Sequence, residues 1–122
     1  MIIDEIPDIP DEPEEAPLPY TWYADQPASF PGGLAAFYKY VGANLHYPAK
    51  ARILGIEGRV MLAFVIGPEG KVEEIQVLQG IGAGCDEEAI RVLQNAPRWN
   101  PPKQRGRPVK QRMVLPVIFK LQ

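Results

Sequence analysis

Residues 57–66 read Glu-Gly-Arg-Val-Met-Leu-Ala-Phe-Val-Ile, and the expected fold is built around this stretch. Its last eight residues carry a single charge, Arg59, which stands at the edge of the run. Successive side chains of an extended strand point to opposite faces, so both faces of this segment are apolar. Because such a strand is normally covered on both sides, we expect residues 59–66 to form the central strand of a sheet.

The segment that follows predicts a hairpin. Gly67-Pro68-Glu69-Gly70 joins two apolar runs and consists mainly of residues that favour turns. Residues 59–66 and 71–78 should therefore pair as antiparallel strands. From Glu74 onward, polar and apolar residues alternate in the second strand, which is typical of an outer strand with one solvent-facing side.

Three helices are expected around this hairpin. Residues 34–45 have apolar side chains at helical spacing, and Pro48 is suited to start a second, short helix over residues 49–54. A third helix is expected over residues 86–93, where Asp86 can accept hydrogen bonds from free backbone N–H groups. The apolar positions of the first helix are Leu34, Phe37, Tyr38, Val41 and Leu45.

The last strand is expected over residues 109–121, and Pro116 indicates where it lies. Proline has no N–H to donate, so it is tolerated in a strand at the edge of a sheet. A right-handed crossover through the third helix would place this strand parallel to the second and next to the first. The expected fold class is α+β, with a three-stranded antiparallel/mixed sheet in the order 2-1-3 and helices packed on it.

The charges of the chain are unevenly distributed. Residues 1–25 contain eight of the fifteen acidic residues and no Lys or Arg, whereas residues 26–122 contain seven acidic and thirteen basic residues, a net of +6. The basic cluster at residues 98–112 includes Trp99 and is the best candidate for nucleic-acid binding. It lacks the repeated aromatic residues of a stacking platform, so a solvated basic face or a surface for an acidic peptide is favoured, and no nucleic-acid partner is expected.

Length and composition predict one domain behind a linker. Residues 1–28 are rich in proline and acid and are expected to be an extended, flexible linker, followed by a domain over residues 29–122. Whether Tyr20, Trp22 and Tyr23 dock on that domain is left open. No apolar run approaches the roughly 20 residues that a transmembrane helix needs, so any membrane anchor is expected upstream.

The residues that could carry chemistry do not form a recognisable site. Glycines in residues 80–84 lack the rest of a phosphate-binding motif, and His46 has no acid or cysteine nearby in the sequence. Cys85 is expected to be a small buried residue, and the adjacent pairs Glu73-Glu74 and Glu87-Glu88 have diverging side chains. We expect no enzyme, no metal and no cofactor.

Between Phe30 and Leu121 the sequence resembles a known family, the C-terminal domain of TonB, in the version found in Bacteroidetes. The order and spacing of several short motifs carry this resemblance. They are Phe30-Pro31-Gly32-Gly33, Tyr47-Pro48 with Ala51, Glu57-Gly58-Arg59-Val60, Gly70-Lys71-Val72, Asp86 with Ala89-Ile90, Trp99-Asn100-Pro101, Gly106-Arg107-Pro108-Val109 and Pro116-Val117-Ile118-Phe119. The chain departs from the family at Cys85, where an aliphatic residue is usual, and in its acidic leader.

The resemblance implies a fold of the TonB/TolA C-terminal type and a non-enzymatic role in energy transduction. It implies a periplasmic domain, an upstream helix in the inner membrane that meets motor proteins, and capture of the TonB-box segment of outer-membrane TonB-dependent transporters. The captured segment would add as a strand beside the last strand. Residues expected to bind it are Lys110, Arg112, Met113, Val114, Leu115, Pro116 and Ile118. Residues expected to have structural roles are Tyr47, Pro48, Gly58, Asp86, Trp99 and Pro101.

Other functions remain open at this point. A TonB-like domain can belong to a membrane sensor or protease, which the sequence upstream of Met1 would reveal. A self-associating envelope scaffold, or a homodimer, would show a dimer mass that depends on concentration.

Overall fold

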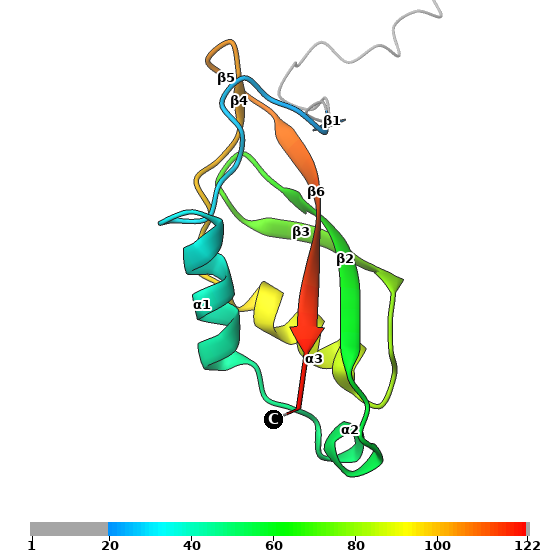
Figure 1. Ribbon diagram of the computed structural model, residues 1–122. Helices are drawn as coiled ribbons and strands as arrows, with labels where there is room; N and C mark the ends of the chain where they lie inside the picture. The colour runs from blue at the N-terminus through cyan, green and yellow to red at the C-terminus, as the bar shows by residue number, and fades with distance from the viewer. Residues whose placement is uncertain (1–19, 122) are drawn as a thin grey trace, which may run out of the picture.

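The computed structural model describes residues 20–121 and consists of a twisted sheet with helices packed against it (Figure 1). The sheet has four strands in the order β1-β6-β2-β3, and a separate small hairpin pairs β4 with β5. The strands are β1 (Tyr20–Thr21), β2 (Gly58–Ile66), β3 (Val72–Gln79), β4 (Lys103–Gln104), β5 (Arg107–Pro108) and β6 (Lys110–Phe119). The helices are α1 (Leu34–Asn44), α2 (Ala49–Leu54) and α3 (Cys85–Gln94). None of the helices within residues 20–121 has the length and apolar character needed to cross a bilayer.

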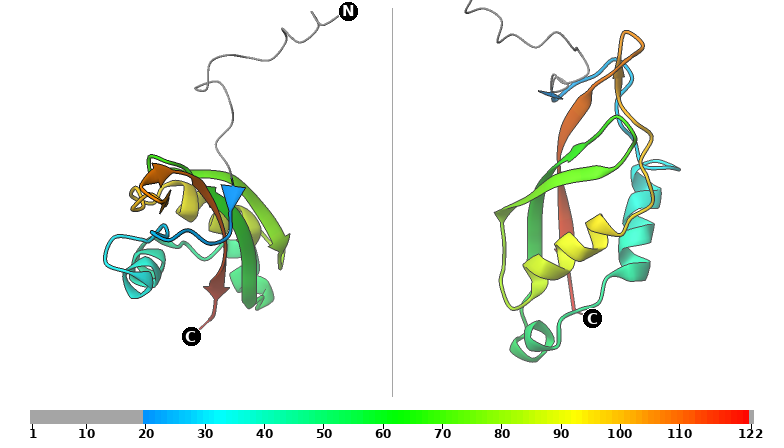
Figure 2. Two further views of the ribbon diagram at one scale, coloured as in Figure 1. Left: turned by 90° about the horizontal axis from the view of Figure 1, so that it is seen from above. Right: turned by 180° about the vertical axis from the view of Figure 1, so that it is seen from behind.

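The predicted order of the three long strands is confirmed. β2 lies between β3 and β6 and is antiparallel to both, so β3 and β6 run in the same direction. α3 connects β3 to the segment that leads into β6, and Figure 2 shows it crossing the sheet on the side away from the viewer of Figure 1. The β1 strand and the β4–β5 hairpin were not predicted.

The central strand is covered fully on only one face. Val60, Leu62, Phe64 and Ile66 are at most 2% exposed and pack in the main core with side chains of α1 and α3. On the other face Met61 and Ala63 are half-buried, while Val65 is buried. The expectation that both faces of this strand are covered is therefore wrong for Met61 and Ala63, because the helices pack on the opposite face of the sheet.

The β2–β3 hairpin has irregular pairing that the alternating pattern did not predict. The register shifts between Ala63 and Val65, where Ala63 pairs with Gln76 but Val65 pairs with Glu73. Glu74 lies at the resulting bulge and has φ of 52°, an unusual value for a residue other than glycine. The turn itself forms as expected, with Gly70 N–H donating to the carbonyl of Gly67 over 3.0 Å.

The helices follow the predicted positions with one exception in α1. Phe37 and Val41 are buried in the core, whereas the side chain of Leu34 is 54% exposed. Leu34 is the first residue of α1, so it lies at the end of the helix, one turn before the buried Phe37. α2 ends at Gly55, which has the expected left-handed conformation with φ of 69°.

Residues 20–30, which we call the N-terminal strap, lie along the rest of the domain. Gln26 pairs with Lys103 and Ser29 pairs with Asn100 through isolated bridges, and Phe30 is buried in the core. The last part of the predicted linker, residues 20–28, thus contacts the domain, and the prediction for residues 1–19 lies outside the described residues.

Candidate functional site

The side of β6 that faces away from β2 is the candidate site. β6 pairs with β2 along its length, from Gly58 opposite Phe119 to Ile66 opposite Gln111. On its other side, and among residues 20–121, β6 pairs at Lys110 and Gln111 with the two residues of β1. Within residues 20–121 no strand pairs with this side of β6 from residue 113 to 119, and we call this backbone edge the docking edge.

Pro116 indicates which backbone groups the docking edge exposes. It lies opposite Met61 in the β2–β6 ladder. A proline nitrogen is accommodated where it points away from the ladder, because it cannot donate a hydrogen bond to the neighbouring strand. Backbone groups alternate in direction along a strand, so Arg112, Val114 and Ile118 also direct N–H and C=O groups outward.

The residues expected to bind a partner lie on one strand but on two faces of it. Met113 and Leu115 are half-buried and pack against the core together with the buried side chains of Val117 and Phe119. Alternate residues belong to the open face, where Arg112 is exposed and Ile118 is 54% exposed. The open-face members of the expected set are Lys110, Arg112, Val114, Pro116 and Ile118. A bound strand would therefore meet both apolar and basic side chains on this face.

Lys110 already has partners within the domain. Its backbone is opposite Tyr20 of β1, and its Nζ atom lies 3.1 Å from Oε1 of Glu73. A contact between Lys110 and an external segment stays a prediction.

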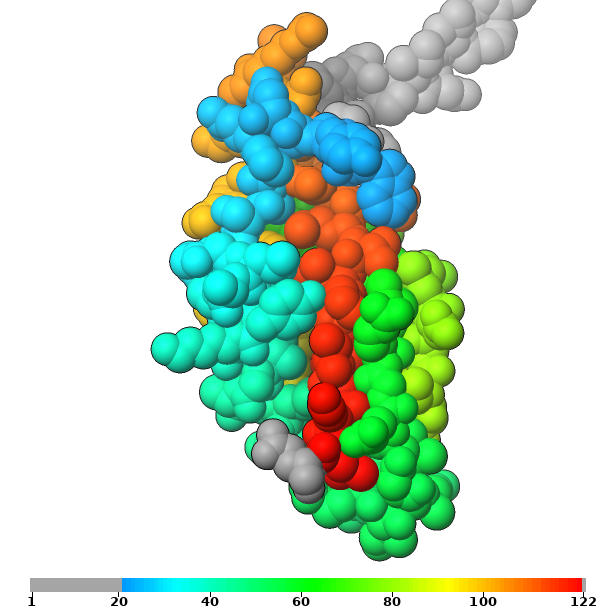
Figure 3. Space-filling model, viewed as in Figure 1, coloured from blue at the N-terminus to red at the C-terminus, as the bar shows by residue number. Residues whose placement is uncertain are grey.

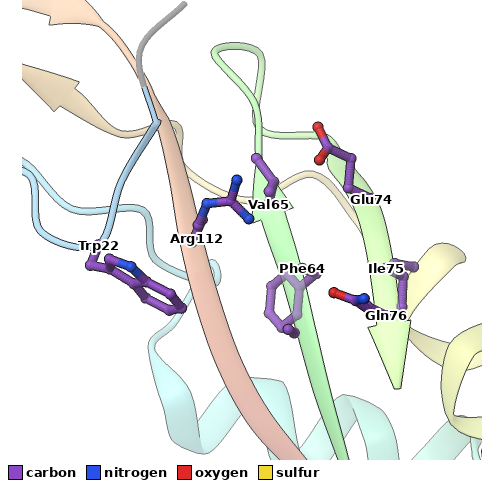
Figure 4. A pocket seen from close by; sticks show the side chains of 8 residues that line it. Trp22, Phe64, Val65, Glu74, Ile75, Gln76 and Arg112 are labelled. Carbon is purple, nitrogen blue, oxygen red and sulfur yellow. The ribbon is translucent and has the colours of Figure 1, made fainter. Parts of the chain in front are cut away.

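A cavity lies over the open face beside the start of the docking edge. It has a volume of about 340 Å³ and its lining includes Trp22, Ala63, Gln76 and Arg112. Figure 4 shows Trp22 on one side of β6 and the Arg112 side chain reaching from β6 toward β2, with Gln76 pointing in from β3. The strap thus contributes an aromatic side chain to the surface of the last strand.

Three of the expected structural residues lie where α2 meets the sheet. The Tyr47 hydroxyl donates to the carbonyl of Ile56, and its ring packs edge-on against Phe119 at 5.6 Å between centroids. Burial raises the pKa of this phenol above its ordinary value, the nearby Cys85 and Glu57 raise it further, and Arg52 opposes them. Pro48 occupies the N-cap position of α2. Gly58 has φ of 151°, and a Cβ atom there would lie 3.0 Å from Cγ2 of Ile81.

The other three expected structural residues lie along the α3 connections. Oδ1 of Asp86 accepts hydrogen bonds from the backbone N–H groups of Ile81 and Gly82, so it stabilises the loop before α3 and does not cap the first turn of the helix. Trp99 is 3% exposed and packs among the rings of the core. Pro101 is exposed, whereas the adjacent Pro102 is buried.

The residues that could carry chemistry remain apart in the structure. His46 is exposed, and its backbone N–H donates to Glu88 over 2.6 Å. Cys85 is buried, and burial raises the pKa of its thiol, with Asp86 and Glu87 raising it further. Among residues 20–121, side chains of His, Cys, Asp and Glu form no group of three able to hold a metal ion.

Sequence reasoning missed one residue that shapes this site, Gln111. It is the one polar residue in an otherwise apolar series on the inner face of β6, and it is 7% exposed. Its amide binds the strap, accepting from Ala28 N over 2.7 Å and donating to Trp22 O over 3.3 Å. The break in the alternation of β6 was the available signal.

Comparisons with known proteins agree with this geometry. The family model described as the Gram-negative bacterial TonB protein C-terminal matches residues 43–121. Protein TonB of Pseudomonas aeruginosa is 30% identical over 76 residues, 62% of this chain and 22% of the relative. Protein TonB of Escherichia coli K12 is 32% identical over 75 residues, 62% of this chain and 29% of the relative. The chain therefore spans less than a third of the length of these relatives.

A solved structure supports the fold separately. The solution structure of the TonB C-terminal domain of Helicobacter pylori superposes with a TM-score of 0.58 at 23% identity, covering 73% of this chain and 94% of the other. The docking edge lies inside the matched residues 43–121, whereas the strap lies before them. TonB C-terminal domains are non-enzymatic interaction domains, which agrees with the expectation from the sequence. The chain belongs to the family of C-terminal domains of the Gram-negative TonB protein.

Proposed function

We propose that this domain captures an extended segment of an outer-membrane transporter, the TonB box, by adding it as a strand to the docking edge. In the complete protein, a helix upstream of the present sequence would anchor the chain in the inner membrane and meet the motor proteins there. The domain itself would work in the periplasm and pass energy derived from the proton gradient to the transporter. Membership of the TonB C-terminal family supports each part of this proposal.

The observation that carries the proposal is the unpaired side of β6. An exposed strand edge presents a row of unpaired N–H and C=O groups, which invites pairing with another chain. Pro116 interrupts that row without breaking the ladder to β2. Strand addition at this edge would obtain affinity from backbone hydrogen bonds and selectivity from alternate side chains.

The backbone alone would bind too weakly. About four new hydrogen bonds at roughly 0.5–1.5 kcal/mol each contribute only a few kcal/mol. Micromolar binding corresponds to about 8 kcal/mol. Side chains must supply the rest, and the exposed Ile118, the half-buried Val114 and the basic Arg112 lie on the open face beside the edge. These residues suit a segment that combines apolar and acidic side chains.

An NMR titration tests this assignment. The isotopically labelled domain would be titrated with a synthetic N-terminal segment of a TonB-dependent transporter, and backbone amide shifts would be followed. We expect the shifts to cluster on residues 113–119. Shifts that cluster on Leu78 and the rest of β3, with β6 unaffected, would show that the other edge of the sheet binds the segment.

Self-association is the second reading, because the same edge can pair with a second copy of the chain. A mass from sedimentation equilibrium that rises from monomer to dimer with concentration, and falls back when the peptide is added, would show that the two partners compete. A domain belonging to a membrane sensor or protease would be recognised from the sequence upstream of Met1.

A further inference from the structure

The strap occupies the beginning of the side of β6 on which the docking edge lies. Tyr20 pairs with Lys110 and Thr21 with Gln111, in parallel. At these two positions the backbone of β6 therefore has strands on both sides. Figure 3 shows the strap lying across the upper end of β6, with the rest of that strand in view below it. An added strand can extend along β6 only up to residue 113 unless the strap leaves.

Several hydrogen bonds hold the strap in this place. Gln26 and Lys103 exchange two backbone hydrogen bonds of 3.0 and 2.9 Å, and Ser29 and Asn100 exchange another two of 3.2 and 2.7 Å. The Gln111 amide adds its bonds to Ala28 N and Trp22 O on the inner side of the strand.

Two further hydrogen bonds involve Asp25, in the middle of the strap. Asp25 N donates to Oε1 of Gln104, and Arg105 N donates to Oδ2 of Asp25. A two-residue strand alone would separate easily, but here its position is fixed by contacts distributed along the next nine residues. Displacement of β1 by an incoming strand would have to break these contacts or bend the chain sharply after Thr21.

Trp22 follows β1 directly and stands where the pairing of β1 with β6 ends. Its side chain is 54% exposed and lines the open-face cavity together with Arg112. Figure 4 shows its ring beside β6 at the level of Arg112. A strand added to the docking edge would end against this ring.

We propose that the strap is a fixed stop, which ends the docking edge at Met113 and so selects the register of the captured segment. This inference rests on the proposed function. Backbone pairing is nearly independent of sequence, and a shift of two residues keeps every side chain on the same face, so an open edge permits several registers. A stop removes those registers that run past Met113 toward Arg112, and Trp22 is the side chain that meets the end of the captured segment. Gln111 acts as a positioning residue, because it holds the strap and does not touch the segment.

Paramagnetic labelling of the same transporter peptide tests the stop. A nitroxide would be attached to one end of the peptide, and amide shifts and line broadening would be measured on the full 122-residue chain. Thr21→Pro would release β1, because proline cannot donate to the ladder, and Gln111→Ala would remove both side-chain anchors. Tyr23→Ala is the matched control, because Tyr23 belongs to the strap but its side chain is 87% exposed. Hydrogen exchange of β2 amides would verify that each variant is folded.

In the wild-type chain and in Tyr23→Ala, we expect peptide-induced shifts to begin at Met113 and line broadening to report one register. In Thr21→Pro and Gln111→Ala, the shifts should extend to residues 110–112, and the line broadening should spread over positions two residues apart. Wild-type shifts that include Lys110 and Gln111 while β1 detaches would refute the stop. The stop would also be refuted if both release variants kept the wild-type register. In either case, binding at the docking edge would still be supported. Absence of any shift along β6 in all four proteins would refute the proposed function and the stop together.

Discussion

Replacing Gly70 with alanine would place a methyl group against the backbone of Trp99. Gly70 has φ of 83°, and a Cβ atom there would overlap the carbonyl oxygen of Trp99 and lie 3.1 Å from its carbonyl carbon. The left-handed conformation costs a non-glycine residue about 1–2 kcal/mol. The overlap would also displace the hydrogen bond from Trp99 N to Gly70 O, now 2.8 Å, which is worth about 0.5–1.5 kcal/mol. We expect Gly70→Ala to lower the free energy of unfolding by roughly 2–4 kcal/mol.

Gly82→Ala separates the two contributions to this loss. Gly82 also has a positive φ, 74°, but a Cβ atom there would have no neighbour within 4 Å. This control should lose only the conformational part, about 1–2 kcal/mol. Thermal unfolding followed by circular dichroism would measure both, and a 3 kcal/mol loss in a domain of this size lowers Tm by roughly 10–20 °C. Equal losses in the two variants would refute the close approach of Gly70 to Trp99 and with it the packing of the β2–β3 turn on the core.

Three further predictions concern charge, burial and the docking edge. The hydrogen bonds from Arg91 hold the pKa of Glu88 below its ordinary value. The stabilisation that Glu88 contributes is therefore complete above its unfolded pKa of about 4.3 and is lost as the pH falls through its folded pKa. The urea midpoints of wild type and Glu88→Gln should differ at pH 7 and converge in acid, and a difference that persists at low pH would contradict this. Buried Cys85 should resist a thiol reagent in the native state and react at once in denaturant, whereas native reactivity equal to a free thiol would disprove its burial. Val114→Pro removes an N–H group that points to the docking edge, so it should weaken binding of the transporter peptide about two- to tenfold with little loss of stability. Leu115→Pro should instead disrupt the hydrogen bonds between β6 and β2 and unfold the domain. The reverse result would show that the backbone groups of Leu115, and not those of Val114, point to the docking edge.

The elements that sequence predicted well are those in which one pattern dominates. Residues 59–66 are apolar on both faces, and the turn at residues 67–70 fixes the pairing of the next strand, so the position of β2 and the strand order followed. The same apolar residues could not show that the face of β2 with Met61 and Ala63 would stay half-buried. Leu34 fits the helical spacing of α1, but its place at the helix start leaves it exposed, because exposure there depends on how α1 lies on the sheet.

The candidate site was predictable only in part. Pro116 in an apolar run indicates an edge strand from local chemistry alone, and the structure places that edge opposite β2. β1 has two residues and no periodicity. The strap that carries it is held by the Gln111 side-chain amide, which accepts a hydrogen bond from Ala28, eighty-three positions earlier in the chain. Such a strand forms because tertiary contacts hold it, so no window of sequence around Tyr20 could predict it.

The strap also determines how a pull on the upstream chain would enter the domain. The chain before residue 20 leads directly into β1, and β1 is bonded to β6, the strand that carries the docking edge. Under the proposed function, a load from the tether would thus reach β6 through the β1 ladder and the Gln111 amide, without first pulling on α1. The captured segment would leave from the same strand. The load would then be carried mainly by β6 and its long ladder to β2, the most extensively paired part of the sheet, and the helices would serve to keep that ladder buried on one face.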